Sequence, residues 1–305
     1  MPEKRITVQA GGRRLTLSNL DKVLYPDGFT KGEVINYYTR VAPVLLPQLK
    51  GRPVTFIRFP DGVGAPGKFF EKDVSRHAPE WVPTARLTGS GSRGRSGPVD
   101  YPLIDDLPTL VWAANLAALE LHVPQWTVGP GDTRRPPDRL VFDLDPGPGT
   151  TIVECGRVAE RLHDALVGDG LTPFAKTSGA KGMQLYCGVR TRSTDRPSAY
   201  AKGLAERLAG QTPDLVVAKM AKALRPGKVF IDWSQNNPAK TTVAPYSLRG
   251  RDRPTVSTPI TWDEVRACRR PEDLVFTADD VLDRVAEFGD LFAGLARTRT
   301  AIPVP

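Results

Sequence analysis

The stretch LVFDLDPGPGT, from Leu140 to Thr150, places two carboxylates one residue apart at the end of an apolar run. Successive side chains of a strand point to opposite faces, so Asp143 and Asp145 are predicted to share one face. The apolar residues between and before them would share the other face. Like charges this close repel each other unless a cation lies between them, and hard divalent cations are the usual partners. The stretch therefore predicts a strand whose end binds a divalent metal ion.

A third aspartate, Asp232, lies in another apolar run, KVFIDWS (228–234). Aspartate is disfavoured inside strands, so this placement also calls for a compensating partner. Two ions held by Asp143, Asp145 and Asp232 would suit phosphoryl transfer, where they clamp the attacking and leaving oxygens. Two alternatives stay open. Each acid could cap a loop or pair with a base. An aspartate-nucleophile phosphatase also uses such a pair, although its pattern has Thr or Val where Gly147 stands.

Several segments carry groups that donate to phosphate oxygens. In the turn Ser178–Gly182, the glycines free backbone amides, and Ser178 and Lys181 add side-chain donors. Lys240 and Arg249 flank a compact segment close to Asp232 in the sequence, and a triphosphate needs cations of this kind. The alternatives are a simple hairpin turn for the first segment and a solvated basic loop for the second.

The segment KFFEK (68–72) sets two adjacent aromatic residues between bases. In an extended segment Phe69 and Phe70 face opposite ways, so only one can be buried and the other can stack on a nucleobase. The alternative is that both belong to the core, which is the commoner fate of phenylalanine.

Composition restricts the class of protein. The chain has 305 residues, 40% of them hydrophobic, and a formal net charge of +8, which predicts a globular protein that meets polyanions or an ordinary basic protein. Three cysteines form no CxxC pair, and no signal peptide or membrane span is evident, so a soluble protein of the reducing cytoplasm is expected. The segment Thr88 to Val99 is predicted to be a flexible basic loop.

Periodicity and capping signals predict mixed α and β elements without the regular alternation of a doubly wound sheet. A helix from about 106 to 121 must end before Pro124, which would place His122 at a helix exit. The other predicted helices run from Thr30 to near Pro47, from about Ile152 to Val167 and from a cap at Ser198 to about Ala209. Two more helices are predicted to begin near Thr261 and Thr277. The predicted strands are Pro173 to Lys176, Met183 to Cys187 and Lys228 to Ser234.

Five ordered motifs stand out together, namely ALELHVPQW (118–126), FDLDPG, KTSGAKG, KVFIDWSQN and KTTVAPYSLRGR. From about Leu15 to Asp290 the chain resembles the polymerase domain of bacterial ligase D, the primase-like polymerase of non-homologous end joining in the archaeo-eukaryotic primase superfamily. The resemblance implies an α+β fold with mixed sheets flanked by helices. It also implies a single domain over residues 1–305, as a stand-alone protein or an excised piece. Its parts would be a DNA-end region (about 1–100), a catalytic core (about 101–255) and C-terminal helices (about 256–305).

The resemblance also implies roles for individual residues. Two Mn²⁺ or Mg²⁺ ions would be held by Asp143, Asp145 and Asp232, which are then the catalytic residues. The remaining roles are nucleoside triphosphate binding by His122, Ser178, Lys181, Lys240 and Arg249, template stacking by Phe69 and Phe70, 5′-phosphate binding by Asn19, Lys22 and Lys31, and a mobile loop containing Arg225 and Lys228.

The implied activity is template-dependent nucleotide transfer that fills gaps and extends ends at double-strand breaks, with a preference for ribonucleotides. The implied partners are DNA bearing a 5′-phosphate, nucleoside triphosphates, Ku and a DNA ligase, at the nucleoid in the cytoplasm and with no membrane. Family members usually carry His where this chain has Gln184, and glutamine cannot titrate near neutral pH. A DNA-end binding module of the same fold with little or no turnover is therefore the alternative.

Overall fold

The chain forms two compact units that interleave along the sequence. A computed structural model describes residues 5–88 and 97–303. The first unit comprises Met1–Arg135, Val243–Val256 and Thr277–Gly289, and the second comprises Pro136–Thr242, Ser257–Phe276 and Asp290–Pro305. The single domain with three consecutive parts stays a prediction.

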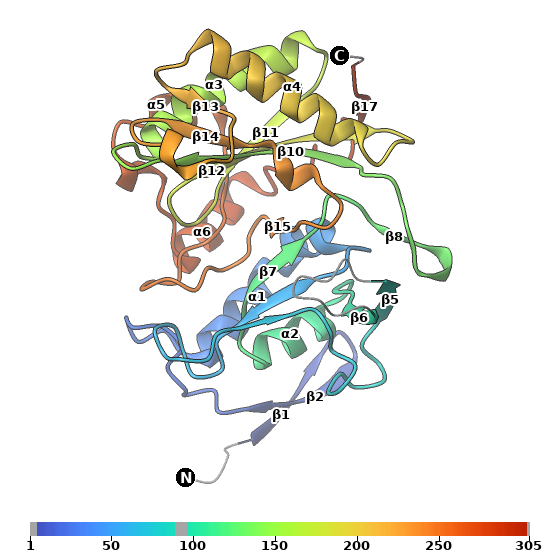
Figure 1. Ribbon diagram of the computed structural model, residues 1–305. Helices are drawn as coiled ribbons and strands as arrows, with labels where there is room; N and C mark the ends of the chain where they lie inside the picture. The colour runs from blue at the N-terminus through green and yellow to red at the C-terminus, as the bar shows by residue number, and fades with distance from the viewer. Residues whose placement is uncertain (1–4, 89–96, 304–305) are drawn as a thin grey trace. The chain divides into compact units, whose positions relative to one another are not determined.

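A seven-stranded sheet forms the second unit, in the order β13-β14-β10-β12-β11-β16, with β17 pairing with β12 (Figure 1). Strand β10 (Arg139–Pro146) lies antiparallel between β12 (Met183–Arg190) and β14 (Val229–Asp232). The other strands are β11 (Pro173–Thr177), β13 (Val216–Val217), β16 (Pro259–Ile260) and β17 (Thr300–Ala301).

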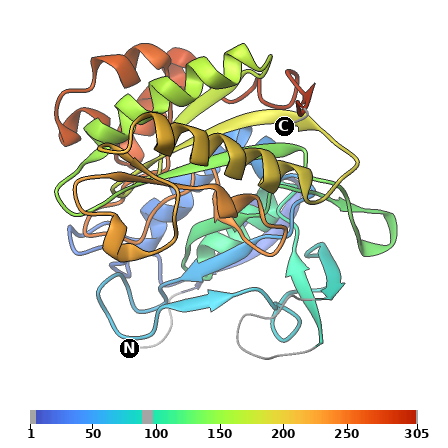
Figure 2. The ribbon, with the colours of Figure 1, turned by 45° about the horizontal axis from the view of Figure 1, so that its top comes forward.

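Two helices, α3 (Ile152–Gly168) and α4 (Arg196–Gln211), cover one face of this sheet (Figure 2). Leu140, Phe142 and Leu144 of β10 are fully buried in the core they share with these helices. On the opposite face Val141 packs in a smaller core with Tyr186. The predicted alternation of β10 is confirmed. The unit also contains α5 (Trp262–Ala267) and the short 3₁₀ helices η2 (Lys222–Leu224), η3 (Trp233–Asn236) and η4 (Pro271–Leu274).

The first unit is built on a sheet in the order β15-β7-β3-β4. Its strand β7 (Ala118–Val123) packs against α1 (Lys31–Leu49), whose Tyr38 hydroxyl donates to the Leu119 carbonyl at 2.6 Å. The other elements are β1 (Arg5–Ala10), β2 (Arg13–Ser18), β3 (Thr55–Arg58), β4 (Phe69–Glu71), β5 (Thr84–Thr88), β6 (Pro98–Pro102), α2 (Leu107–Asn115), β8 (Val128–Gly129), η1 (Pro130–Asp132), β9 (Thr133–Arg134), α6 (Ala278–Phe288) and β15 (Thr242–Val243), of which Val243 belongs to this unit.

Most predicted elements are confirmed, including the helices that start after Thr30, Thr261 and Thr277, and the structure shows a capping box at each of the three. The helix predicted from about 106 to 121 is wrong beyond Asn115: Ala117 has φ +56°, which ends the helical path, and β7 follows. His122 therefore lies on a strand and not at a helix exit. The cap at Ser198 is also wrong, because α4 already begins at Arg196.

Three further expectations concern the predicted basic loop, the cysteines and the presence of membrane-spanning helices. Of the predicted loop Thr88 to Val99, residues 89–96 lie outside the described residues, while Thr88 ends β5 and Pro98 begins β6. The three cysteines are buried free thiols. Among the described residues, every helix is too short or too polar to cross a lipid bilayer.

Candidate active site

A row of polar side chains crosses four strands of the second unit on one face. In the strand register, Asp143 is paired with Asp232 on one side and with Gln184 on the other, and Gln184 is paired with Lys176. Directly paired residues of antiparallel strands project to the same face, with Cα atoms about 4.5–5.5 Å apart. Asp145, two residues beyond Asp143, shares this face. The structure thus brings together the three aspartates that the sequence singled out.

The carboxylates influence one another electrostatically. Burial of its carboxylate, followed by the charge of Asp145, raises the pKa of Asp143 to about 7, and the charge of Asp232 adds to the rise. A hydrogen bond from Gln184 and the charge of Lys176 act in the opposite direction. Burial and then Asp232 also raise the pKa of Asp145, which is more exposed, while Arg225 lowers it. The cluster therefore favours a positive partner.

Sequence reasoning missed Lys176 and the way Gln184 is oriented. Lys176 is fully buried, donates to the Ser257 hydroxyl and lies with Nζ 5.7 Å from the centroid of the Tyr186 ring. The Tyr186 hydroxyl donates to Gln184 Oε1 at 3.4 Å, so the amide nitrogen of Gln184 is the group that faces Asp143. A lysine inside an apolar strand was the available signal, but its pairing with Gln184 depends on the register.

Asp232 also caps the turn that follows it. Its carboxylate accepts from the Ser234 amide at 3.0 Å and from Gln235 Nε2 at 2.7 Å. Lys240 Nζ lies 3.8 Å from Asp232 Oδ2 and donates to the Ser234 hydroxyl. The loop-capping alternative is therefore confirmed for Asp232. Its side chain still lies on the same face as Asp143, with which it is paired. The role of Lys240 in nucleotide binding stays a prediction.

The donor set fits a hard divalent cation in chemistry and in strand position, because three carboxylates lie on one face of adjacent strands. Within residues 5–88 and 97–303, however, no three His, Cys, Asp or Glu side chains are already gathered as an ion site. Asp232 Oδ2 accepts the hydrogen bond from Gln235 and keeps a further lone pair that could contact an ion. The assignment of the three aspartates as metal ligands stays a prediction.

The turn between β11 and β12 is a hairpin in which Ser178 is central. The Ser178 hydroxyl accepts from the amides of Ala180 at 3.2 Å and Gly182 at 3.1 Å, while the Lys181 side chain is exposed. A Cβ atom on Gly182 would lie 2.2 Å from the Leu144 carbonyl oxygen, so only glycine fits here. The turn is thereby held against the end of β10, and anion binding by Ser178 and Lys181 stays a prediction.

In the first unit His122 and Arg249 are gathered around one carboxylate. His122 Nε2 lies 2.9 Å and Arg249 Nε 3.3 Å from Glu120 Oε2. Glu120 was not singled out from the sequence, although a glutamate between two leucines in ALELHV was a signal of a compensated buried charge. Nucleotide binding by His122 and Arg249 stays a prediction.

Phe69 and Phe70 form an exposed aromatic pair on the edge strand β4. Their exposed fractions are 53% and 56%, so the alternative that both belong to the core is wrong, as is the expectation that one of them is buried. Lys72 Nζ lies 5.6 Å from the Phe70 ring centroid. Two rings and a base at a sheet edge suit contact with a nucleobase, which stays a prediction.

The structure brings Asn19, Lys22 and Lys31 into one hydrogen-bonded loop. The Lys22 amide donates to the Asn19 carbonyl at 3.0 Å, and the Lys31 amide donates to the Lys22 carbonyl at 2.8 Å. Lys22 Nζ forms an exposed ion pair with Asp61 at 3.0 Å, and Lys31 Nζ donates to the Ser18 hydroxyl. The three residues are neighbours, as a common phosphate site requires, and their binding of a 5′-phosphate stays a prediction.

The segment with Arg225 and Lys228 lies against the turn that follows β10. The Gly147 amide donates to the Lys228 carbonyl at 2.9 Å, and the Arg225 guanidinium lies 3.8 Å from the Phe230 ring centroid. A Cβ atom on Gly147 would lie 1.9 Å from the Arg225 carbonyl oxygen. Gly147 thus permits this close packing, and mobility of the segment stays a prediction.

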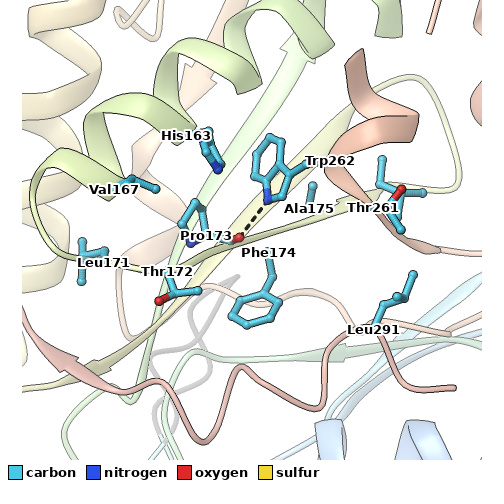
Figure 3. Close-up of a pocket in the computed structure, with 11 residues that line it drawn as sticks. His163, Val167, Leu171, Thr172, Pro173, Phe174, Ala175, Thr261, Trp262 and Leu291 are labelled. Carbon is cyan, nitrogen blue, oxygen red and sulfur yellow. Dashed lines mark hydrogen bonds between the residues drawn. The ribbon is translucent and has the colours of Figure 1, made fainter. Parts of the chain in front are cut away.

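A surface cavity of about 490 Å³ lies elsewhere in the second unit (Figure 3). His163, Phe174 and Trp262 line it, and the Trp262 indole donates to the Pro173 carbonyl at 3.1 Å. The aspartates of the row do not line this cavity, so it is separate from the candidate site.

Comparison with known proteins identifies relatives of this chain. The chain is 46% identical over 284 residues to the multifunctional non-homologous end joining protein LigD of Mycolicibacterium smegmatis, covering 92% of this chain and 36% of that protein. It is 32% identical over 279 residues to the bifunctional non-homologous end joining protein LigD of Bacillus subtilis, covering 90% and 43%. The chain therefore spans well under half the length of these relatives.

Among solved structures, the polymerase domain from Mycobacterium tuberculosis ligase D in complex with DNA matches with a TM-score of 0.86 and 45% identity, covering 93% of this chain and 98% of that one. The expected α+β fold with mixed sheets is confirmed by this match. Residues 30–292 match the family described as "LigD, primase-polymerase domain". The chain belongs to the LigD primase-polymerase domain family.

Proposed function

We propose that the protein is a template-dependent nucleotidyltransferase that fills gaps and extends ends at broken DNA. The observation that carries the proposal is the register of β10 and β14, which places Asp143 beside Asp232 on the face that also holds Asp145. Three carboxylates on one face could hold the metal ions that assist phosphoryl transfer, and the chain belongs to a family described as a primase-polymerase domain, which supports the proposal.

The carboxylates would hold two divalent ions, Mn²⁺ or Mg²⁺. When bound, the ions would lower the cost of forming the 3′-oxyanion and neutralise charge on the departing pyrophosphate. Gln184 and Lys176 orient and partly compensate Asp143, which keeps a ligand in place on a rigid strand. Ser178, Lys181, Lys240, His122 and Arg249 would donate to the triphosphate.

DNA would be bound through its backbone and its exposed bases. The matching Mycobacterium tuberculosis domain was solved in complex with DNA. The net charge of +8 and the exposed Phe69 and Phe70 support sequence-independent binding that weakens as salt rises. Preference for ribonucleotides, and assembly with Ku and a ligase, are further proposals that rest on the family resemblance.

Primer extension on a gapped duplex with a 5′-phosphate tests the proposal. We expect the whole chain to extend the primer with ribonucleotides faster than with deoxyribonucleotides, in Mn²⁺ or Mg²⁺ and not in chelator. DNA affinity is measured on the same duplex by fluorescence anisotropy. If the protein binds the gap tightly but extends nothing in either metal, it is a DNA-end binding module instead.

We expect the double substitution of Lys22→Ala and Lys31→Ala to remove the preference for a 5′-phosphate. Two lost cations cost roughly tenfold or more in affinity for a phosphorylated end, because each contributes a charge-assisted hydrogen bond. Affinities for gaps with 5′-phosphate and 5′-hydroxyl ends are compared.

The matched control is Lys50→Ala, which removes an exposed lysine at the far end of α1. It should lower both affinities equally and slightly, and leave their ratio unchanged. A wild-type ratio in the Lys22 and Lys31 double variant would locate the phosphate site elsewhere.

A further inference from the structure

Glu120 is a buried carboxylate inside an apolar strand. It lies between Leu119 and Leu121 on β7, with only 5% of its surface exposed, and both neighbours are fully buried. An ionised carboxylate in such a place costs several kcal/mol unless it is paired and hydrogen-bonded. A residue that carries this cost calls for a reason beyond packing.

Three groups surround the Glu120 carboxylate. His122 Nε2 lies 2.9 Å from Oε2 and the Gly250 amide donates to Oε1 at 3.0 Å, while Arg249 Nε forms an ion pair with Oε2 at 3.3 Å. Although burial acts to raise the pKa of Glu120, the hydrogen bond from His122 and the charge of Arg249 hold it at about 2. Glu120 is therefore an anion at neutral pH, and its carboxylate holds one guanidinium and one imidazole.

The backbone is built to bring Arg249 to this place. The Leu121 amide donates to the Ser247 hydroxyl at 2.9 Å, and the Ala244 amide donates to the Leu121 carbonyl at 2.8 Å, so residues 244–247 run beside β7. A Cβ atom on Gly250 would lie 2.2 Å from the Phe59 ring, so only glycine allows the amide of residue 250 to reach Glu120. The contact of Arg249 and Gly250 with Glu120 is thus fixed both by the pairing of residues 244–247 with β7 and by the close packing of Gly250 on Phe59.

We propose that Glu120 is a positioning residue for nucleotide binding, which acts through Arg249 and His122. The inference rests on the proposed function, in which these two side chains contact the triphosphate. With the carboxylate present, both side chains are held before the triphosphate arrives, so binding does not have to order them. Without the carboxylate, binding has to immobilise a long side chain, which costs conformational entropy.

The negative charge of Glu120 acts in the opposite direction, because it repels a triphosphate. The Arg249 guanidinium at 3.3 Å and the His122 ring nitrogen at 2.9 Å already offset this charge, so less of it acts on the ligand. Removing Glu120 also removes the anion that holds the Arg249 guanidinium, so this side chain can turn toward solvent. The loss of order outweighs the lost repulsion, and nucleotide binding weakens.

The test is a double-mutant cycle on the whole chain, with Glu120→Ala, Arg249→Ala and the double variant. Calorimetry measures the Kd of a non-hydrolysable nucleoside triphosphate analogue with Mn²⁺ on the gapped duplex. We expect Glu120→Ala to raise the Kd about tenfold. Extension at saturating nucleotide should stay within about threefold of wild type, because the loss is in binding. The double variant should bind no more weakly than Arg249→Ala alone.

Glu71 supplies the matched control, because it is the same kind of cluster in the same sheet. Its carboxylate receives Arg58 Nη1 and His77 Nε2, each at 2.8 Å, on the edge strand β4. Glu71→Ala should leave the nucleotide Kd unchanged. Thermal unfolding checks that each variant is folded. If Glu120→Ala does not fold, Glu120→Gln is measured in its place, because glutamine keeps the volume and one hydrogen-bond acceptor. Glu120→Gln should raise the Kd about threefold.

A wild-type Kd in the folded Glu120 variant overturns the inference. The inference also fails if the effects of Glu120→Ala and Arg249→Ala on the binding free energy add up in the double variant. The proposed function has its own readout in the same experiment. If His122→Ala and Arg249→Ala both bind nucleotide as wild type does, the nucleotide site itself is misassigned, whatever Glu120 does.

Discussion

We expect Asp232→Ala to abolish primer extension while DNA affinity stays within about twofold of wild type, because the substitution removes an anion and no DNA-binding cation. Transition-state stabilisation by bound metal is worth several kcal/mol, and a loss of about 4 kcal/mol lowers the rate about a thousandfold. Single-turnover extension and anisotropy on the same gapped duplex measure the two quantities.

Asp164 provides the control for Asp232. It is an exposed aspartate on α3 in the same unit, where it contacts only the neighbouring His163 among the pairs described. Asp164→Ala should leave both extension and DNA affinity unchanged. An Asp232→Ala variant that still extends the primer at a tenth of the wild-type rate or faster would contradict the metal assignment.

The second large effect is expected for Asp143→Asn, which should abolish extension as completely yet make the metal-free protein more stable. The pKa of Asp143 is raised to about 7 from an ordinary value of 3.8. The folded state therefore binds the proton more tightly than the unfolded chain, and stability falls as pH rises through this window. Asparagine has no proton to lose, and its oxygen still accepts from Gln184.

The predicted gain in the free energy of unfolding is on the order of 4 kcal/mol at pH 8, where the penalty of the wild-type carboxylate is complete. It should shrink below pH 7 and vanish near pH 4. Urea unfolding in chelator at several pH values measures it, with Asp164→Asn as the control for the charge change alone. A gain that does not depend on pH would show that Asp143 is not the titrating group.

Local signals allowed much of the fold to be predicted. The capping boxes at Thr30, Thr261 and Thr277 involve residues three apart, so the sequence contains everything that forms them. The alternation of β10 likewise depends on a period of two that can be read directly. These features needed no knowledge of what the chain packs against.

The rest depended on contacts between distant residues. The apolar residues from Leu110 to Leu121 fit a helical period, but the positive φ of Ala117 and the pairing of β7 with β3 decide otherwise. The partners of Gln184 follow from strand register, which periodicity does not specify. Glu120 becomes intelligible only when Arg249, far along the chain, is placed beside it.

The two-sided character of β10 limits how this chain can change in length. The leucines of this strand point toward the helices α3 and α4, and its aspartates point to the opposite face of the sheet. An inserted or deleted residue within Arg139–Pro146 would exchange the two sides from that point onward, burying carboxylates among apolar helices and leaving leucines in their place. Lengthening or shortening of the polypeptide is therefore compatible with this architecture only outside that strand.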